Sequence, residues 1–400
     1  MGNTSAQPDQ RFAFPSPATG AKDQTIRLIV RPSIWGQQTR LRFTNVFGTK
    51  PVTFDDVYVG LQLGGPAVVA GTNRPVTFGG KGTVTIAPGD SVWSDAVGID
   101  FVRDPAAADL AGRKLAVSFH IVGESGPMTW HGRALTTSYV SPPGSGSHGK
   151  SEQEAAFPYG TSSWFFLNAV DMMSPADSFA IVTLGDSITA GTASTMNGDD
   201  RWPDVLSRRL RAIYGNRVAV VNAGIGGNQV TGPVEYSAAK PFAGGPSAKM
   251  RLERDVLELS GVTHMIWLEG INDFSKNGNA PFEKVRDGMK EIVSHIRARR
   301  ADPRIVGATV ITALGSSSAA HGFAEQDGKR RALNDFIRAS GLFDAVIDFD
   351  RATIDPETGG LKPEFVPDST IGHAGDKLHP NRAGYLAMGM AIELGLFQPK

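Results

Sequence analysis

The chain has 400 residues, more than one hydrophobic core usually serves, so two or three domains are expected. Forty Lys and Arg residues balance forty Asp and Glu residues, and this zero formal net charge argues against a nucleic-acid partner, which would favour a basic excess. The absence of cysteine excludes disulfides, thiol catalysis and Cys-ligated metal centres.

No stretch of the sequence is long and apolar enough to predict a membrane-spanning helix. Residues 1–6 lack the basic start and the apolar centre of a signal peptide. Two locations therefore stay open: a secreted or periplasmic protein whose signal peptide has been removed, or a cytoplasmic protein. The sequence predicts no particular oligomeric state.

The first part of the chain, from about residue 25 to residue 139, shows the two-residue period of β-strands. In residues 115–121, large apolar side chains alternate with small or polar ones. The other strand-like runs are short and are separated by turns rich in Gly and Pro; they span residues 26–30, 41–43, 52–61, 76–78, 83–86 and 98–101. Many short strands without helical runs predict a jelly-roll-like antiparallel β-sandwich.

A segment rich in Pro, Gly and Ser, residues 142–160, follows these strands and is typical of a linker or a covering loop. Residues 164–167 then return to strand-like character. We therefore predict an all-β domain in residues 1–175 and a second domain in residues 176–400.

From about residue 178 the pattern changes to alternating strands and helices. Five strand-like runs are nearly all apolar, as in a parallel sheet covered on both faces: residues 180–184, 218–223, 264–268, 305–311 and 345–349. Amphipathic helices are predicted between them, and the first begins near Pro203 and ends just before Gly215. This alternation predicts a flavodoxin-like doubly wound α/β domain, whose ligand sites lie at the carboxyl ends of its strands.

The first of these strands runs directly into Gly185-Asp186-Ser187. A serine at this position faces the ligand site, close to the backbone N–H groups that begin a helix. The alternative is a turn with an N-capping serine, and the same tripeptide recurs at Gly89-Asp90-Ser91 after a Pro-containing turn. The tripeptide alone therefore does not decide between a nucleophile and a turn.

Three further polar blocks follow later strands. Glycines in residues 224–227 allow close approach of a ligand to the backbone, and Gln229 breaks the dinucleotide-binding pattern Gly-x-Gly-x-x-Gly. Asn272 follows the third strand, either as an amide donor to the site or as a turn residue. Asp376 and His379 are close enough for a carboxylate to orient an imidazole, although such a pair is often only a surface feature.

Together the four blocks, in this order and at successive strand ends, resemble those of the SGNH hydrolases, the GDSL family of serine esterases and lipases. The resemblance covers roughly residues 178–400. It implies that Ser187 is the nucleophile, that His379 is its base and that Asp376 orients the base. It also implies an oxyanion hole formed by the N–H groups of Ser187 and Gly227 and the side chain of Asn272.

Two points of this resemblance are less specific. The second block has three glycines, so Gly224 is an alternative to Gly227. The first half of the chain is similar to the β-sandwich of a two-domain, acetylxylan-esterase-like branch of the family, with landmarks at residues 44–48, 163–165 and 201–204.

The function implied is hydrolysis of short-chain acyl esters, above all acetyl esters of small molecules or carbohydrates, through an acyl-enzyme that needs no cofactor or metal. An acyltransferase with the same triad and a non-catalytic carbohydrate-binding protein are the alternatives. An α/β-hydrolase is disfavoured because the chain has no Gly-x-Ser-x-Gly sequence.

Two other groups of residues suggest weaker hypotheses. His373 could join Asp376 and His379 in a metal site, with local hydrogen bonding as the alternative. Aromatic and His side chains of the first half could form a sugar-binding or pocket-covering surface: Trp35, Trp130, His131 and Trp164.

Overall fold

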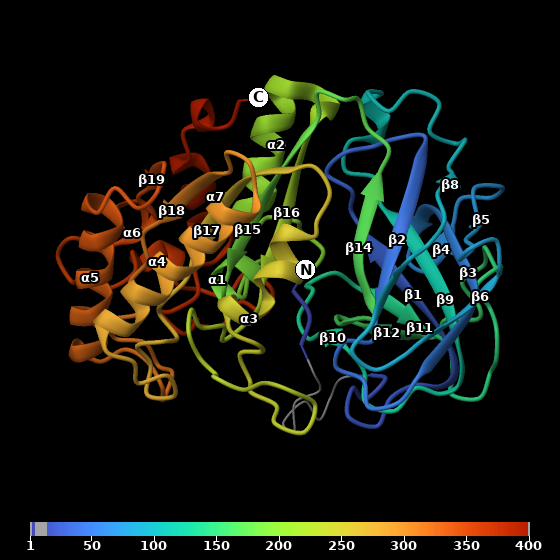
Figure 1. Cartoon of the computed structure of the whole chain (residues 1–400), viewed down its shortest axis with the longest axis horizontal. Coiled ribbons are helices and arrows are strands. Elements are labelled where there is room, and N and C mark those ends of the chain that lie inside the picture. The colour runs from blue at the N-terminus through green and yellow to red at the C-terminus, as the bar shows by residue number, and fades with distance from the viewer. Residues whose placement is uncertain (1, 5–13, 399–400) are drawn as a thin grey trace. The chain divides into compact units, whose positions relative to one another are not determined.

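The structure is a computed structural model that describes residues 2–4 and 14–398. Part of the N-terminal segment considered above for an export signal therefore lies outside the described residues. The chain divides into two compact units (Figure 1). One unit comprises Asn3–Ala176 with Ser237–Pro241, and the other comprises Asp177–Tyr236 and Phe242–Lys400 together with the first two residues.

The first unit is built from antiparallel strands in two main sheets. In the described part of the chain the larger sheet has the order β12-β11-β1-β9-β3-β4, and β5 and β6 also pair with β3. Its strands are β1 (Lys22–Val30), β3 (Val52–Gly64), β4 (Ala67–Val68), β5 (Arg74–Pro75), β6 (Thr83–Ile86), β9 (Leu115–Glu124), β11 (Ser138–Val140) and β12 (Tyr159–Thr161).

The smaller sheet has the order β14-β2-β7, and β8 pairs with β2. Its strands are β2 (Gln38–Thr44), β7 (Ser91–Trp93), β8 (Val97–Gly98) and β14 (Leu167–Met172). A short pair, β10 (Trp130–His131) with β13 (Trp164–Phe165), and a 3-10 turn, η1 (Ala108–Leu110), complete the unit.

Aromatic side chains join the inner faces of the two sheets. Phe43 of β2 lies against Phe54 of β3 and Phe119 of β9, with ring centroids 5.3 and 5.1 Å apart. All three side chains are fully buried. This packing of one antiparallel sheet on another confirms the predicted β-sandwich.

The sugar-binding surface predicted for this unit is wrong. Trp35, Trp130 and His131 are buried, with at most 4% of each residue exposed, and both tryptophans belong to the hydrophobic core. Trp130 stacks on Phe165, with ring planes 11° apart. Trp164 is only partly buried, but it packs against the same core. The core takes these rings because burying a large aromatic surface is strongly favourable.

The second unit contains a parallel sheet of five strands in the described residues, in the order β16-β15-β17-β18-β19. The strands are β15 (Phe179–Gly185), β16 (Val218–Gly224), β17 (Val262–Leu268), β18 (Arg304–Ala308) and β19 (Ala345–Ile347). This order confirms the predicted flavodoxin-like doubly wound domain. The fifth strand is shorter than predicted because Asp348 caps a helix that begins at Phe349.

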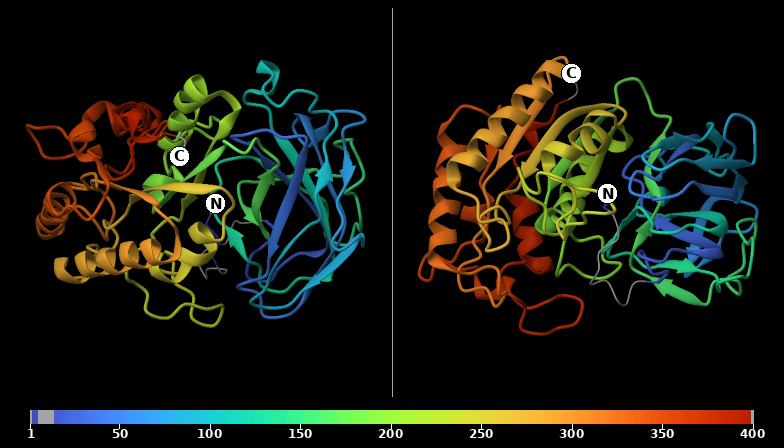
Figure 2. Two further views of the ribbon diagram at one scale, coloured as in Figure 1. Left: turned by 45° about the horizontal axis from the view of Figure 1, so that its top comes forward. Right: turned by 60° about the horizontal axis from the view of Figure 1, so that its bottom comes forward.

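Helices cover both faces of this sheet (Figure 2). One layer packs around α7, and the other packs around α4. The first layer holds α2 (Trp202–Tyr214), α6 (Phe349–Thr353) and α7 (Arg382–Ala391), and the second holds α3 (Ala248–Leu252), α4 (Phe282–Arg299) and α5 (Ala324–Ala339). The shorter helical segments are α1 (Ser187–Ala190), η2 (Gly215–Arg217), η3 (Glu253–Leu257), η4 (Pro363–Phe365) and η5 (Leu394–Leu396).

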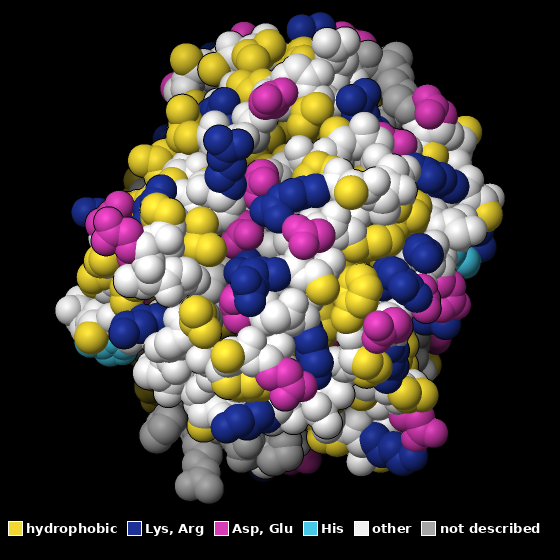
Figure 3. All heavy atoms as spheres, turned by 90° about the vertical axis from the view of Figure 1, so that its left-hand side faces the viewer, with side chains coloured by type: hydrophobic (Ala, Val, Ile, Leu, Met, Phe, Trp, Pro, Cys, Tyr) yellow, Lys and Arg dark blue, Asp and Glu magenta, His cyan; other side chains and the backbone are white. Residues whose placement is uncertain are grey.

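The first long helix follows its predicted signals. Pro203 lies in the first turn of α2, and Gly215 follows its last residue with a φ of 60°. Among the described residues, none of the helices has the length and apolar character needed to cross a membrane. On the face shown in Figure 3, Lys and Arg side chains are interspersed with Asp and Glu side chains, in keeping with the balanced composition.

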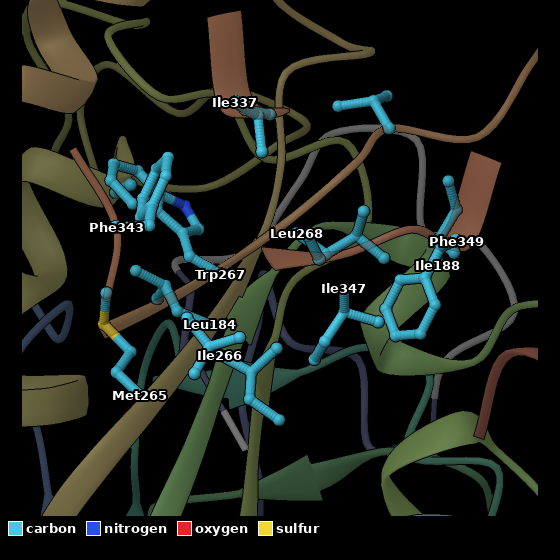
Figure 4. Close-up of a cluster of buried hydrophobic side chains, with 14 of the residues drawn as sticks. Leu184, Ile188, Met265, Ile266, Trp267, Leu268, Ile337, Phe343, Ile347 and Phe349 are labelled. Atoms are coloured by element: carbon cyan, nitrogen blue, oxygen red, sulfur yellow. The ribbon is translucent and has the colours of Figure 1, made fainter. Parts of the chain in front are cut away.

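A dense apolar core supports the strand ends of the second unit (Figure 4). Leu184 and Leu268, near the ends of β15 and β17, are at most 1% exposed and belong to this core together with Ile266 and Ile347. Ile188 joins them from α1, directly after Ser187. The residues that follow these strands are therefore fixed to closely packed side chains.

Candidate active site

Three of the predicted blocks lie together at the carboxyl ends of the strands of the parallel sheet. In the register of the strands, Gly185 of β15 lies opposite Gly224 of β16 on one side and Leu268 of β17 on the other. The carboxyl ends of the three central strands are therefore level. The chain segments that follow them, with Ser187 and Asn272, share the edge at which doubly wound sheets bind ligands.

Ser187 is held in a tight turn between β15 and α1. The Asp186 side chain caps α1 by accepting a hydrogen bond from the Ile188 N–H at 2.9 Å. A Cβ atom on Gly185 would lie 2.4 Å from the carbonyl oxygen of Leu268, so this position requires glycine. The turn leaves Ser187 about 7% exposed, at the start of the helix.

The predicted triad residues form a continuous chain of hydrogen bonds. His379 Nε2 lies 2.8 Å from Ser187 Oγ, and His379 Nδ1 lies 2.6 Å from Asp376 Oδ2. The other carboxylate oxygen of Asp376 accepts the N–H groups of Leu378 and His379, both at 2.9 Å. This local turn explains how side chains three residues apart meet, and it lets one histidine contact both partners.

The Asp376 carboxyl is held in its ionised form. Burial alone would raise the pKa of this carboxyl, but the hydrogen bond and charge of His379, with the N–H groups of His379 and Leu378, hold the pKa well below its ordinary value. The carboxylate can therefore accept the Nδ1 proton of His379. Nε2 is then free to accept the proton of Ser187.

The second block forms a tight turn beside Ser187. The N–H of Asn228 donates to the carbonyl of Ile225 at 3.1 Å, and Gly227 at the turn has a φ of 80°. A Cβ atom added to the neighbouring Gly226 would lie 3.9 Å from the Cβ atom of Ser187, so this turn is close to the nucleophile. In the described residues the N–H of Gly227 has no hydrogen-bond partner.

The alternative donor, Gly224, has its N–H occupied. It donates to Asn222 Oδ1 at 2.9 Å, and Gly224 itself ends strand β16. A Cβ atom on Gly224 would lie 2.3 Å from the backbone nitrogen of Ala190, so its glycine serves close packing. The structure thus gives Gly224 a structural role and leaves the N–H of Gly227 available.

Asn272 joins the second and third blocks. Its side-chain Nδ2 donates to the carbonyl oxygen of Asn228 at 3.0 Å. The next residue, Asp273, accepts the N–H of Val230 at 2.9 Å, so two consecutive residues tie the turns together. Asn272 is about 7% exposed, as Ser187 is.

Arg251 is a supporting residue that the sequence did not reveal. Its guanidinium is fully buried and donates to the carbonyls of Gly185 and Ala223 at 2.8 and 2.5 Å, and to Asn228 Oδ1 at 2.8 Å. Asp255 balances its charge at 3.2 Å. One arginine therefore fixes the ends of β15 and β16. A lone Arg in a short helix carries no sequence signal for such a role.

Three acidic side chains are buried in this region: Asp186 and Glu269, which both interact with Arg251, and Asp273, which interacts with Glu269. Burial raises the pKa of Asp186 to about 8 and the pKa of Asp273 to about 7, and it also raises the pKa of Glu269. Repulsion from Glu269 adds to the shift of both aspartates. Burial therefore favours the neutral form of the carboxyl beside the nucleophile.

The proposed metal ligand His373 makes a local contact. Its Nδ1 accepts the N–H of Gly375 at 3.1 Å. Within the residues that the structure describes, no group of three or more His, Asp or Glu side chains is arranged to hold a metal ion. The second Gly-Asp-Ser sequence is also explained locally: Ser91 begins β7, and its Oγ donates to Thr44 Oγ1 at 2.8 Å.

Comparison with protein families gives one match. The model of the GDSL-like lipase/acylhydrolase family matches residues 183–387, just over half of the chain. This range contains all four blocks of the site. No curated protein matches the sequence significantly.

Solved structures resemble about half of this chain. A carbohydrate acetylesterase from Sinorhizobium meliloti is 14% identical, and the match covers 54% of this chain and 96% of that chain, with a TM-score of 0.38. A lipase/acylhydrolase from Enterococcus faecalis is 23% identical over 56% of this chain and 98% of its own, with a TM-score of 0.40. At such values the likenesses are no basis for assigning an activity or a substrate.

Proposed function

The chain belongs to the GDSL-like lipase/acylhydrolase family, which implies an ester hydrolase, and we propose that it is a serine esterase with Ser187 as its nucleophile. The observation that carries this proposal is the unbroken hydrogen-bonded chain from Ser187 Oγ through His379 to Asp376. A nucleophile, a base and a group that orients the base are the three parts that serine catalysis requires.

The reaction begins when the Ser187 hydroxyl transfers its proton to His379 Nε2 and attacks the ester carbonyl carbon. Asp376 stabilises the imidazolium that forms and keeps its ring in place. The tetrahedral intermediate carries its negative charge on the former carbonyl oxygen. When it collapses, His379 gives the proton to the departing alcohol, and the acyl group remains on Ser187.

Three N–H groups stabilise the oxyanion in this proposal. The N–H of Ser187 and the N–H of Gly227 are backbone donors, and the second Nδ2 hydrogen of Asn272 completes the set. The first hydrogen of that amide is already bound to Asn228, so the group is oriented before substrate binds. Water, activated by His379, then attacks the acyl-enzyme and releases the acid.

For the substrate we propose short-chain acyl esters, above all acetyl esters of carbohydrates. The support is the sequence similarity to the two-domain, acetylxylan-esterase-like branch of the family, carried by residues 44–48, 163–165 and 201–204. Transfer of the acyl group to a sugar hydroxyl would use the same residues and remains the alternative activity.

An ester panel tests the proposal. Nitrophenyl acetate, butyrate and octanoate and acetylated xylo-oligosaccharides are incubated with the protein and with the Ser187→Ala variant. We expect hydrolysis that is fastest for the acetyl esters and absent in the variant. Equal turnover by the variant, or turnover of none of the esters, would overturn the proposal. Acylated sugar formed in preference to free acid would instead identify a transferase.

A further inference from the structure

A short loop between β18 and α5 contacts both the block that contains Asp376 and His379 and the block that contains Asn272. Its neck is closed by a hydrogen bond from the Gly315 N–H to the Gly322 carbonyl, at 3.1 Å. Ser316 Oγ and the Ser317 N–H both donate to the carbonyl oxygen of Asp376, at 2.7 and 3.1 Å. The loop is thereby fixed to the block that supplies the acid and the base.

The same loop is also fixed to the block that contains Asn272. The N–H of Lys276 donates to the Ala320 carbonyl at 3.0 Å. The buried side chain of Gln326, at the start of α5, donates through Nε2 to the Ile271 carbonyl at 3.0 Å. His321 therefore belongs to a loop whose hydrogen bonds connect the block that contains the base with the block that contains Asn272.

The hydrogen bonds around Gln326 determine where the proton of the His321 ring lies. The N–H of Gly322 donates to Gln326 Oε1 at 2.9 Å, which identifies that atom as the amide oxygen. The amide nitrogen therefore faces His321 Nδ1, at 2.7 Å, and donates to it. Because Nδ1 accepts a hydrogen bond, it carries no proton, and the neutral ring must carry its proton on Nε2.

The surroundings of the ring favour this neutral form. Burial and, to a lesser extent, the charge of His379 lower the pKa of His321 to about 4, and the charge of Asp376 only partly opposes this shift. At neutral pH, His321 is therefore a fixed hydrogen-bond donor and cannot serve as a second base.

The Nε2–H of His321 is available to a ligand. Among the described residues this nitrogen has no hydrogen-bond partner. It is also absent from the set of fully buried polar atoms without a partner, so solvent or a ligand can reach it. We propose that His321 is a substrate-positioning residue that donates its Nε2–H to an oxygen atom on the alcohol portion of the ester. This inference rests on the proposed esterase function.

The loop that carries His321 is hydrogen-bonded to the Asp376 carbonyl, in the block that also supplies the base, and this placement points to the alcohol portion of the ester. His379 delivers its proton to the departing alcohol oxygen, so the alcohol must lie next to the imidazole when the intermediate collapses. Esters of polyols and sugars carry further hydroxyl or ring oxygens close to that oxygen and can accept the bond. Phenyl acetate has no such oxygen. His321 would thus favour polyol esters.

Variants of His321 test this selectivity on two substrates. His321→Phe keeps a ring and removes the donor, and we expect kcat/KM for acetylated xylobiose to fall about 3- to 10-fold, the usual effect of one neutral hydrogen bond. The change should be mainly in KM, and phenyl acetate should change less than about 2-fold. His321→Gln, whose amide can replace the Nε2 donor, should recover part of the loss. His295→Phe, a histidine in α4 that contacts Glu253, is the matched control.

Equal losses on both substrates, or no loss on either, would overturn the inference. If neither substrate is hydrolysed by the unaltered protein, the proposed function fails instead, and the ring can still be tested by NMR. Assigned with the help of the His321→Phe spectrum, the His321 ring signals should not titrate between pH 5.5 and 8. Gln326→Glu would place an acceptor at Nδ1, and the signals should then titrate in that range. Titration in the unaltered protein would contradict a fixed neutral donor.

Discussion

The side chain of Asn272 donates to the backbone carbonyl of Asn228 across 3.0 Å and thereby joins the turns that follow β17 and β16. One hydrogen of the amide is used in this bond, and the carbonyl acceptor fixes which end of the amide is the nitrogen. The other hydrogen is left for a ligand at the strand ends. The orientation of this donor is thus set by the folded backbone before any substrate arrives.

Replacement of Asn272 by Ala should lower kcat by about 10²–10³-fold, the usual effect of removing one oxyanion donor. KM should change little, because the bond strengthens only as negative charge develops on the carbonyl oxygen. Steady-state kinetics on nitrophenyl acetate measure both constants. An increase in KM alone would show that Asn272 only binds the ground state.

Replacement of Asp376 by Asn should lower kcat by about 10³–10⁴-fold. The Asn side chain can still accept the N–H groups of Leu378 and His379 through Oδ1, so the turn should survive. Its Nδ2 would then donate to His379 Nδ1 and move the ring proton to Nε2, where it blocks transfer from Ser187. His379→Ala should be at least as severe. Near-normal turnover by Asp376→Asn with an unchanged melting temperature would contradict this role.

Asp186 should make the folded state less stable as pH rises. Its pKa is raised by burial from 3.8 to about 8, so between these values the unfolded chain releases a proton that the folded chain retains. The stability present below about pH 4 is therefore lost progressively toward pH 8. Asn at this position cannot ionise, so the stability of Asp186→Asn relative to the unaltered protein should increase by more than about 1 kcal/mol from pH 5 to pH 8.

Urea unfolding at several pH values measures this difference. Asp90→Asn is the matched control, since Asp90 occupies the same place in the second Gly-Asp-Ser sequence and is exposed. An equally large dependence on pH for Asp90→Asn would show that the effect at Asp186 does not come from burial. A pH-independent difference for Asp186→Asn would show that the carboxyl is already ionised in the folded protein at low pH.

Arg251→Ala should reduce the free energy of unfolding by about 2–4 kcal/mol, because it empties a fully buried position and leaves the buried Oδ1 of Asn228 without its donor. Asp255 keeps its pair with Arg254, and the Gly185 carbonyl keeps the N–H of Ile225. Arg299→Ala removes an exposed arginine that pairs with Glu253 and should cost less than about 1 kcal/mol. Urea unfolding followed by circular dichroism compares the two variants. Equal effects would mean that Arg251 does not hold the strand ends.

The sequence predicted those parts of the molecule that follow from local patterns. Apolar runs and helical spacing predicted the parallel sheet, and the polar blocks placed Ser187 and Asn272 after the carboxyl ends of two of its strands. The sequence was a poorer guide to whether a given side chain faces solvent or the core. Trp35 and Trp130 could equally face solvent or the core, and the structure buries both.

Residues that act through long-range contacts left no pattern in the sequence. Arg251 binds carbonyl groups that the fold brings together from distant segments, and the role proposed for His321 depends on a loop that the fold joins to the Asp376 block. The choice between Gly224 and Gly227 likewise depended on the partner of one N–H, which is the side chain of Asn222. Such partners are determined by tertiary packing and could be identified only in the folded chain.

The identity of the nucleophile is tested most directly by mass spectrometry of the intact protein after treatment with a fluorophosphonate, followed by peptide mapping. The proposed mechanism predicts one adduct per chain, located on Ser187, in the unaltered protein and in the Ser91→Ala variant. It predicts no adduct in Ser187→Ala, provided that circular dichroism shows this variant to be folded. Undiminished labelling of folded Ser187→Ala, or an adduct on another residue of the unaltered protein, would contradict the assignment of Ser187 as the nucleophile.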